Sequence, residues 1–113
     1  MTDAAERLAI LVTTVGDPAA ARALARAAIE ARLAACVQIL PIVSHYAWDG
    51  EICESHEFLL QMKHLGTDYA ALAALVRRQH AYETPEILRI DVGEADPAYL
   101  AWARATTVRQ GFS

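Results

Sequence analysis

The sequence has few glycines, only two cysteines and no long apolar run. Its five glycines form no glycine-rich loop of the kind that cradles nucleotide phosphates. Two cysteines are too few for a disulfide framework and agree with a reducing compartment. No apolar stretch approaches the roughly 18 residues that suggest a membrane span, and residues 1–6 lack a cationic signal-peptide start. We therefore expect a cytoplasmic protein with no membrane partner.

A concentration of positive charge is also missing. Ten basic and 14 acidic residues give a net charge of −4, and the arginines are scattered without forming a basic stripe. Nucleic acid is therefore not an expected partner, because clustered Lys and Arg bind its backbone. A length of 113 residues suits one domain with a modest core, and no linker or low-complexity segment divides residues 1–113.

What the sequence does contain is two long β-prone runs, residues 36–48 and 51–63, joined at Asp49-Gly50. This dipeptide favours a two-residue type I′ turn, which requires positive φ at both positions. Such a turn fixes a register in which facing residue numbers sum to 99, so Cys36 and Cys53 lie about 33 Å apart. A bulge or a sheet-edge position is expected at Pro41, because proline donates no ladder hydrogen bond.

The arms of this hairpin are about twice the usual strand length of roughly 5–6 residues. They overhang any sheet that one small domain can build, and exposed ladder edges recruit other chains. We therefore interpret the hairpin as an assembly device. Near its tip, Tyr46, Trp48 and Cys53 are predicted to contact a neighbouring subunit, since aromatic residues commonly anchor interfaces. Cys36, in an apolar context, is predicted to be a buried thiol.

The remaining segments alternate between strand and helix patterns. The pattern predicts strands at 8–15 and 86–92, and helices from Asp17-Pro18 to about Ala34, after residues 66–68 and from Asp96-Pro97, with frayed ends at about 1–6 and 109–113. The order β-α-β-β-α-β-α predicts an α+β fold, the ferredoxin-like plait, with a four-stranded antiparallel sheet, two helices on one face and an additional C-terminal helix. Tyr99 and Trp102 are expected to face the core.

Four stretches resemble those of one known family: EARLAACV at residues 30–37, SHYAWDG at 44–50, HAYETPEI at 80–87 and YLAW at 99–102. Together they resemble the CutA divalent-cation tolerance proteins over about residues 8–105. The resemblance implies a homotrimer similar to the PII signalling proteins, a role in tolerance of copper and other divalent metals, and no established reaction. Some members carry a copper site whose positions correspond here to Thr13, Gln79 and His80. In those members the ligands are one cysteine and two histidines, so only His80 of this chain keeps a metal-binding side chain there. A lone imidazole rarely suffices for a transition metal.

Two groups of residues are candidate sites. His80, Tyr82 and Glu83 lie on one loop and are predicted to line a ligand cleft with Lys63, where the family usually carries lysine. The alternative is that His80 caps the carbonyl end of the preceding helix while Tyr82 packs. A weak zinc or copper site is predicted at His45, Glu54 and His56, which share one face of the hairpin. The alternative is that these residues form a solvated or inter-subunit polar face that binds no metal.

The sequence therefore predicts a non-catalytic trimer concerned with metal tolerance, with no tightly bound cofactor and with copper or another divalent ion bound weakly at inter-subunit clefts. A PII-like small-molecule sensor is the main alternative. Two others are a small enzyme that uses His80, Tyr82 and Glu83 in an inter-subunit pocket, and a purely structural trimer.

Overall fold

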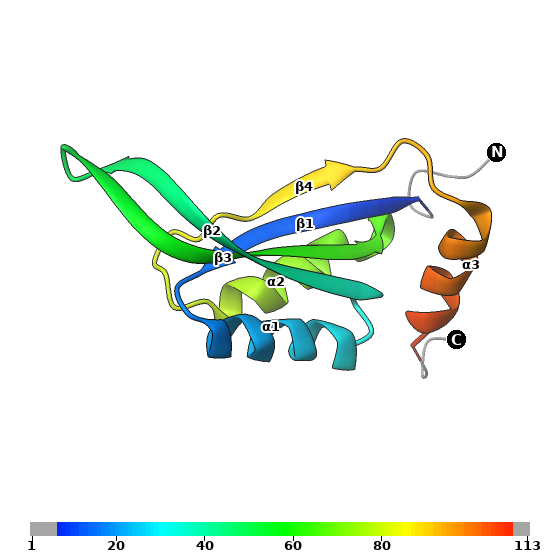
Figure 1. Ribbon diagram of the computed structural model, residues 1–113. Coiled ribbons are helices and arrows are strands. Elements are labelled where there is room, and N and C mark those ends of the chain that lie inside the picture. Colours follow the sequence, from blue (N-terminus) through cyan, green and yellow to red (C-terminus); the bar gives the residue numbers. More distant parts are fainter. Residues whose placement is uncertain (1–6, 110–113) are drawn as a thin grey trace.

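The computed structural model describes residues 7–109, and its element order confirms the predicted α+β plait. The elements are β1 (Leu8–Val15), α1 (Pro18–Glu30), β2 (Cys36–Trp48), β3 (Glu51–Leu65), the 3-10 turn η2 (Gly66–Asp68), α2 (Tyr69–Gln79), β4 (Leu88–Asp91) and α3 (Pro97–Thr106). The four strands form an antiparallel sheet in the order β2-β3-β1-β4. Figure 1 shows α1 and α2 on one face of the sheet, and α3 beyond the end of the sheet that is opposite the tip of the β2–β3 hairpin.

The hairpin register is the predicted one along its whole length, from Trp48 opposite Glu51 to Cys36 opposite Lys63. Asp49 and Gly50 have φ values of 51° and 78°, as a type I′ turn requires. Pro41 causes no register shift and pairs with Phe58. It is tolerated because β2 is an edge strand, the second of the two expected possibilities.

The core lies between the sheet and the helices α1 and α2. Leu11 and Val15 of β1 pack there with Leu60 and Met62 of β3. The helices contribute Leu24 and Ala28 from α1 and Leu72 and Val76 from α2, all of them buried. Small alanine side chains along α1 let this helix approach the sheet closely.

The first helix ends earlier than predicted, at Glu30 rather than near Ala34. Arg32 adopts the left-handed region with φ 57°, the N–H of Leu33 donates to the Ala28 carbonyl at 3.1 Å, and the N–H of Arg32 donates to the Ile29 carbonyl at 2.9 Å. These two hydrogen bonds form a Schellman motif. The sequence does not predict this motif, because an arginine occupies the position where glycine is usual.

The fourth strand is also shorter than predicted, covering Leu88–Asp91 instead of residues 86–92. Continuing the β1–β4 register would place Glu86 opposite Thr14. There the carbonyl of Thr14 instead accepts a hydrogen bond from His80 Nε2 at 2.8 Å. A loop side chain thus takes the ladder position, and the strand begins two residues later.

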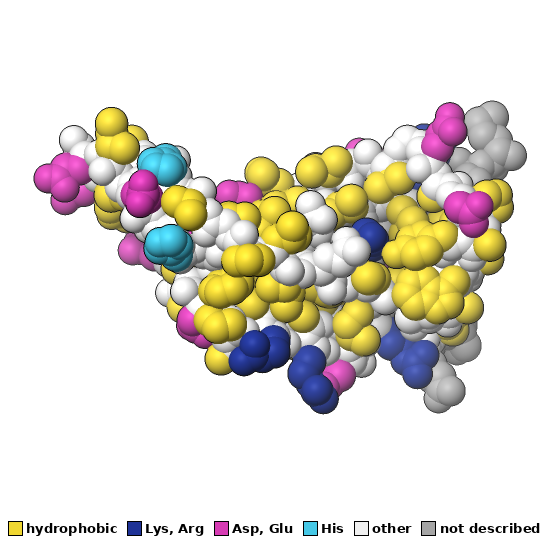
Figure 2. All heavy atoms as spheres, in the orientation of Figure 1, with side chains coloured by type: hydrophobic (Ala, Val, Ile, Leu, Met, Phe, Trp, Pro, Cys, Tyr) yellow, Lys and Arg dark blue, Asp and Glu magenta, His cyan; other side chains and the backbone are white. Residues whose placement is uncertain are grey.

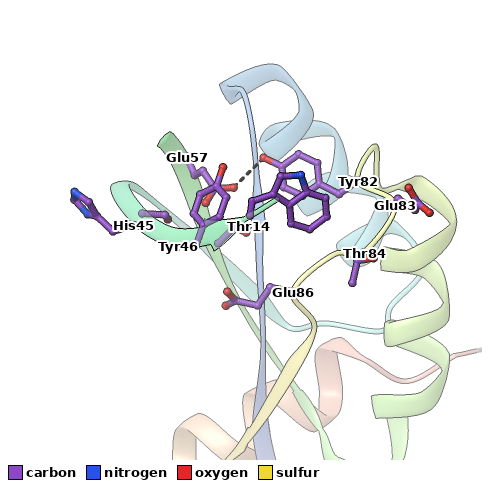
Figure 3. A pocket seen from close by; sticks show the side chains of 10 residues that line it. Thr14, His45, Tyr46, Glu57, Tyr82, Glu83, Thr84 and Glu86 are labelled. Carbon is purple, nitrogen blue, oxygen red and sulfur yellow. Dashed lines mark hydrogen bonds between the residues drawn. The ribbon is translucent and has the colours of Figure 1, made fainter. Parts of the chain in front are cut away.

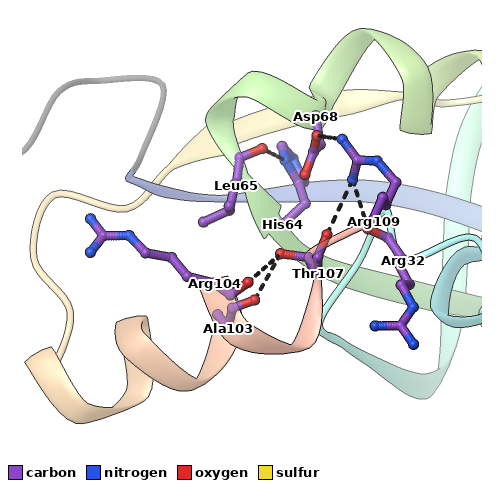
Figure 4. A network of polar contacts seen from close by, with 8 residues as sticks. All are labelled: Arg32, His64, Leu65, Asp68, Ala103, Arg104, Thr107 and Arg109. Carbon is purple, nitrogen blue, oxygen red and sulfur yellow. Dashed lines mark hydrogen bonds and ion pairs between the residues drawn. The ribbon is translucent and has the colours of Figure 1, made fainter. Parts of the chain in front are cut away.

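The C-terminal end of α3 is tied down by polar contacts, which corrects the predicted fraying at residue 109 (Figure 4). Arg109 Nη2 donates to Oδ1 of the buried Asp68 at 2.7 Å, and Arg109 Nη1 donates to the Arg32 carbonyl at 2.9 Å. Arg32 Nη1 in turn donates to the Val108 carbonyl at 3.1 Å. Residues 1–6 and 110–113, for which fraying is also predicted, lie outside the described residues.

Two predictions of burial are wrong. Trp102 is 47% exposed instead of facing the core, although Tyr99 beside it packs against the cluster that contains Leu8 and Ala103. Cys36 is only half-buried, because β2 is an edge strand without a neighbour on its outer side. Cys53, predicted to contact a neighbouring subunit, is half-buried in the protomer.

The face of the sheet opposite α1 and α2 is apolar and largely open. Leu88 and Ile90 of β4 pair with Val12 and Ile10 of β1 on this face and are each 52% exposed, and Leu40 of β2 is 43% exposed. Hydrophobic side chains are spread over the sheet in Figure 2, whereas Lys and Arg lie mostly on the helix side. The chain therefore presents an apolar surface that no described segment covers.

Candidate ligand cleft at the base of the hairpin

A cavity of about 620 Å³ lies where the hairpin leaves the sheet, within the range of small-ligand sites. Its walls come from the end of β1, the outer part of the hairpin and the loop before β4 (Figure 3). The lining residues are Thr14, Ser44, His45, Tyr46, Trp48, Glu57, Tyr82, Glu83, Thr84 and Glu86. The lining contains aromatic rings and carboxylates but neither Lys nor Arg.

Strand alternation explains why these side chains meet. Ser44, Tyr46 and Trp48 of β2 share one face, and the register places Glu57 of β3 on the same face. The hydroxyl of Tyr82 donates to Glu57 Oε2 at 2.8 Å and so links the loop to the hairpin. Figure 3 shows His45 pointing away from this group and Glu83 at its edge.

Gly16 leaves room for this link. A Cβ at Gly16 would lie 3.3 Å from the Tyr82 hydroxyl oxygen, tighter than an ordinary contact. The Tyr46 hydroxyl forms a separate hydrogen bond with Ser55 Oγ at 2.7 Å, which fixes the second tyrosine of the wall. Both rings are therefore held before any ligand binds.

His80 lies behind this wall and is hydrogen-bonded through both ring nitrogens. Nε2 contacts the Thr14 carbonyl at 2.8 Å, and Nδ1 contacts the N–H of Tyr82 at 3.1 Å. A carbonyl only accepts and a backbone N–H only donates, so the ring is the neutral tautomer protonated at Nε2. His80 is the C-cap residue of α2, but its side chain holds the loop against β1 and does not bond the last carbonyls of the helix, contrary to the alternative interpretation of the sequence.

Tyr82 is a weak acid in this setting. Burial raises its pKa to about 12, with the hydrogen bond to Glu57 and the charge of that carboxylate adding to the effect. At neutral pH the hydroxyl therefore stays protonated and donates to Glu57.

Within one chain, Lys63 lies away from the other residues of the predicted ligand cleft. It pairs with Ile10 on β1, whereas His80 bonds to Thr14, four residues or about 13 Å further along that strand. Its ammonium nitrogen instead lies 5.7 Å from the centre of the Tyr99 ring. Tyr82 and Glu83 line the cavity, but Lys63 could join them only from another copy of the chain.

Two of the three residues of the predicted hairpin metal site are in contact. His45 Nε2 lies 2.7 Å from Glu54 Oε1, so this cross-strand pair is confirmed. His56 does not complete it: residues 7–109 contain no group of three His, Cys, Asp or Glu side chains arranged to hold a metal ion. At the other candidate position, Thr13 is fully buried, Gln79 is exposed and both nitrogens of His80 are engaged.

Sequence reasoning overlooked Glu57 and Glu86, although both line the cavity. A signal for Glu57 was present, because the predicted register already placed it on the face of Tyr46 and Trp48. Glu86 carried no such signal, since the predicted strand would have paired it with β1.

A family model described as CutA1 divalent ion tolerance protein matches residues 9–106. The chain is 38% identical over 99 residues to the divalent-cation tolerance protein CutA of Thermus thermophilus, covering 87% of this chain and 96% of that protein. It is 41% identical over 88 residues to protein CutA of Mus musculus, covering 77% of this chain but only 50% of the mouse protein.

Solved structures agree with this similarity. CutA from Synechococcus elongatus superposes with a TM-score of 0.89 at 37% identity, covering 96% of this chain and 95% of that one. A structure described as the periplasmic divalent cation tolerance protein CutA of Archaeoglobus fulgidus gives a TM-score of 0.87 at 30% identity, covering 89% and 99% of the two chains.

Proposed function

The chain belongs to the CutA1 divalent ion tolerance protein family, and we propose that it contributes to tolerance of divalent cations, copper included, as a non-catalytic homotrimer. The observation that carries this proposal is the family match itself. It extends over residues 9–106, from β1 to the end of α3, and relatives that match over most of their length are named for this tolerance.

The shape of one protomer supports assembly. Beyond its pairing with β1, which ends at Phe58, the hairpin continues to its tip with no other strand of residues 7–109 beside it (Figure 1). The radius of gyration is 15.1 Å, against about 13 Å for a compact domain of this size. Exposed apolar residues on the hairpin, Val43 at 51% and Ile52 at 86%, and on the open sheet face favour partners of the same kind.

We propose that metal and small-ligand sites lie between subunits. The pair of His45 and Glu54 supplies two ligands, and a weak site for copper or another divalent ion needs a further ligand, which a neighbouring copy could bring. In the same way a neighbouring copy could bring Lys63 to the cleft of Tyr82 and Glu83. No resident cofactor is required by this proposal.

The chemistry of the loop favours a binding role over catalysis. A general acid or base needs a pKa near the working pH, whereas that of Tyr82 is raised to about 12. Both nitrogens of His80 are occupied by backbone groups. Neither side chain is therefore poised for proton transfer, which weighs against the small enzyme.

A PII-like sensor of small molecules is the second candidate, favoured by the cavity of about 620 Å³. Nucleotides suit it poorly, because its lining has carboxylates and lacks Lys and Arg. Thermal-shift measurements with ATP separate the two functions: strong stabilisation would favour the nucleotide sensor, and none is expected for the tolerance protein.

No helix in residues 7–109 is long and apolar enough to cross a membrane. We propose a cytoplasmic location, supported by Cys36 and Cys53, which are both free thiols. Cell fractionation of the source organism checks this, since recovery of the protein in a periplasmic fraction would contradict it.

The function is tested in cells. Deleting the gene should lower the copper concentration that halves growth, and the wild-type gene on a plasmid should restore it. A His45→Ala, His56→Ala double variant tests direct binding, with Arg22→Ala, an exposed substitution on α1 outside every candidate site, as the control. Unchanged copper and zinc tolerance after deletion would contradict the proposed function. Equal copper binding by the wild type and the double variant in calorimetry would remove the hairpin site alone.

A further inference from the structure

We propose that Trp48 of one copy inserts into a recess on the next copy, which is formed around Lys63 where α3 meets the open sheet face. This inference rests on the proposed homotrimer and deepens it, because it names the side chain and the recess that join neighbouring copies. Trp48 is 63% exposed near the hairpin tip, and strand alternation places it on the open sheet face with Tyr46. Tryptophan is among the residues that most often dominate the energy of a protein interface.

The recess has a volume of about 430 Å³ and lies beside α3, at the end of the sheet opposite the hairpin tip (Figure 1). Most of its lining is apolar and comes from β1 and from the segment between β4 and α3: Leu8, Ile10, Val92, Ala95 and Tyr99. Asp96 also lines it, but its carboxylate accepts hydrogen bonds from the N–H groups of Ala98 and Tyr99. The recess therefore suits an apolar ring better than an anion.

Lys63 is the one cationic side chain of this lining. It pairs with Ile10 across β1 and β3, so both side chains lie on the open sheet face. Its ammonium nitrogen is 5.7 Å from the centre of the Tyr99 ring, within the range of a cation–π interaction. An indole that enters the recess would place a second ring against the same ammonium, and tryptophan is the best ring for this contact.

The recess cannot be filled by Trp48 of the same chain. Trp48 faces Glu51, whereas Lys63 lies 12 residues further along β3, a distance of about 40 Å. The two features lie at opposite ends of one face, so they can meet only when the hairpin end of one copy contacts the α3 end of the next. Such head-to-tail contacts close into a ring when the rotation permits it, as in a trimer.

The charges at the two ends are complementary. Residues 33–62 contain neither Lys nor Arg, and the cleft beside Trp48 is lined by Glu57, Glu83 and Glu86. Within one chain Lys63 lies six residues from Glu57 on β3, about 20 Å away, too far to pair with it. Insertion of Trp48 brings Lys63 of the next copy to the mouth of this cleft. One contact thus buries the indole and supplies the cation that the cleft lacks.

Cross-linking tests the contact directly. Glu51 faces Trp48 across the hairpin, and Ala95 lines the recess, so Glu51→Cys and Ala95→Cys are combined in a Cys36→Ala, Cys53→Ser background. A short bismaleimide should join position 51 of one copy to position 95 of the next and give covalent dimers and closed trimers in denaturing electrophoresis. Glu51→Cys alone should not link, because a head-to-tail contact keeps the hairpin tips apart. Glu51→Cys with Ala23→Cys, on the exposed side of α1, is the matched control and should not link either.

Sedimentation at a series of protein concentrations tests the energy of the contact. Trp48→Ala should raise the concentration at which half of the trimer dissociates by about tenfold or more, as expected for an anchoring aromatic residue. Ile29→Ala, an exposed apolar residue on α1, should leave it unchanged. Lys63→Gln should raise it as well, whereas Arg22→Gln on α1 should not. In the Trp48→Ala, Lys63→Gln double variant the two effects should multiply to less than their product, because the side chains contact each other.

Three results would overturn the proposal while the wild type still sediments as a trimer: no link between positions 51 and 95, equal linking in the control pair, or an unchanged dissociation midpoint in Trp48→Ala. Each of them leaves the proposed trimer and its role in metal tolerance standing. A monomeric wild type without cross-linker would contradict the proposed assembly itself and this contact with it. The two failures are therefore distinguished by the mass of the unmodified protein.

Discussion

His64 is fully buried between β3 and α2, with its ring centre 5.9 Å from that of Tyr69. Its Nδ1–H donates to the carbonyl of Leu65 at 2.7 Å, while Nε2 is buried and has no hydrogen-bond partner among residues 7–109 (Figure 4). Protonating Nε2 would place a positive charge where nothing accepts its hydrogen. Burial accordingly lowers the pKa of His64, and the positive charge of Arg89 lowers it further against the raising effect of the Leu65 hydrogen bond and of Asp68 and Asp91.

The lowered pKa makes stability depend on pH. Below about pH 6.5 the unfolded chain binds a proton at His64 that the folded chain resists, so the free energy of unfolding should fall as the pH falls. Above that pH the contribution is fully present. Urea unfolding at fixed protein concentration between pH 5 and 8 measures the slope, which should be smaller in His64→Phe. Gln79→Ala, an exposed substitution that removes no titratable group, is the control and should retain the wild-type slope; equal slopes in wild type and His64→Phe would contradict the assignment.

His80 is expected to be structural. Replacing it with alanine removes both hydrogen bonds that hold the loop before β4 against β1 and should lower the free energy of unfolding by about 1–3 kcal/mol. The neighbouring exposed Gln79 offers a control, since Gln79→Ala should change stability by less than about 0.5 kcal/mol. Chemical denaturation of both variants measures the difference, and equal stabilities would show that the two hydrogen bonds contribute nothing.

At the scale of elements, the hairpin turn depends on its backbone conformation. Gly50 has φ 78°, and a Cβ built there meets no atom within 4 Å. Any cost of Gly50→Ala is therefore conformational and should be about 1–2 kcal/mol. Gly93→Ala is the matched control, because it also meets open space and has no positive φ. Thermal or urea unfolding compares the two, and a Gly50→Ala variant as stable as Gly93→Ala would contradict the turn assignment.

The elements that could be predicted from the sequence are those fixed by local chemistry. Asp49-Gly50 set the register of the whole hairpin, and the Asp17-Pro18 and Asp96-Pro97 pairs set the starts of α1 and α3 through carboxylates that accept from backbone N–H groups. The end of α1 and the start of β4 could not be predicted in this way. Arg32 is held in a left-handed conformation, and His80 reaches Thr14 across 66 positions of sequence.

The same distinction applies to the candidate site. Tyr82 and Glu83 were expected to line a cleft and do so, because they lie on one short loop. Lys63 was added to them by family resemblance, and the fold places it near Tyr99 instead. Glu57 was missed because it becomes notable only when a loop residue 25 positions away donates to it. Residues that are brought together by tertiary structure are thus the least predictable part of the site.

At the scale of the whole molecule, the proposed trimer is expected to assemble through the open sheet face. Ile90 lies on that face and is 52% exposed in the protomer. In a trimer with cyclic symmetry each copy presents the same residue, so Ile90→Glu would desolvate a carboxylate at every interface. An unpaired buried charge costs several kcal/mol of association free energy, which is enough to make most interfaces dissociate. The variant should therefore dissociate while each protomer keeps its fold.

Sedimentation measures this directly. The wild type at micromolar concentration should have three times the chain mass of 12.3 kDa, and Ile90→Glu should sediment at the mass of one chain with an unchanged circular dichroism spectrum. Ile29→Glu is the matched control: Ile29 is also apolar and 38% exposed but lies on α1, on the other side of the sheet, and should leave the trimer intact. A monomeric wild type would contradict the assembly. Equal dissociation in the two variants would instead mean that the copies do not associate specifically through the open sheet face.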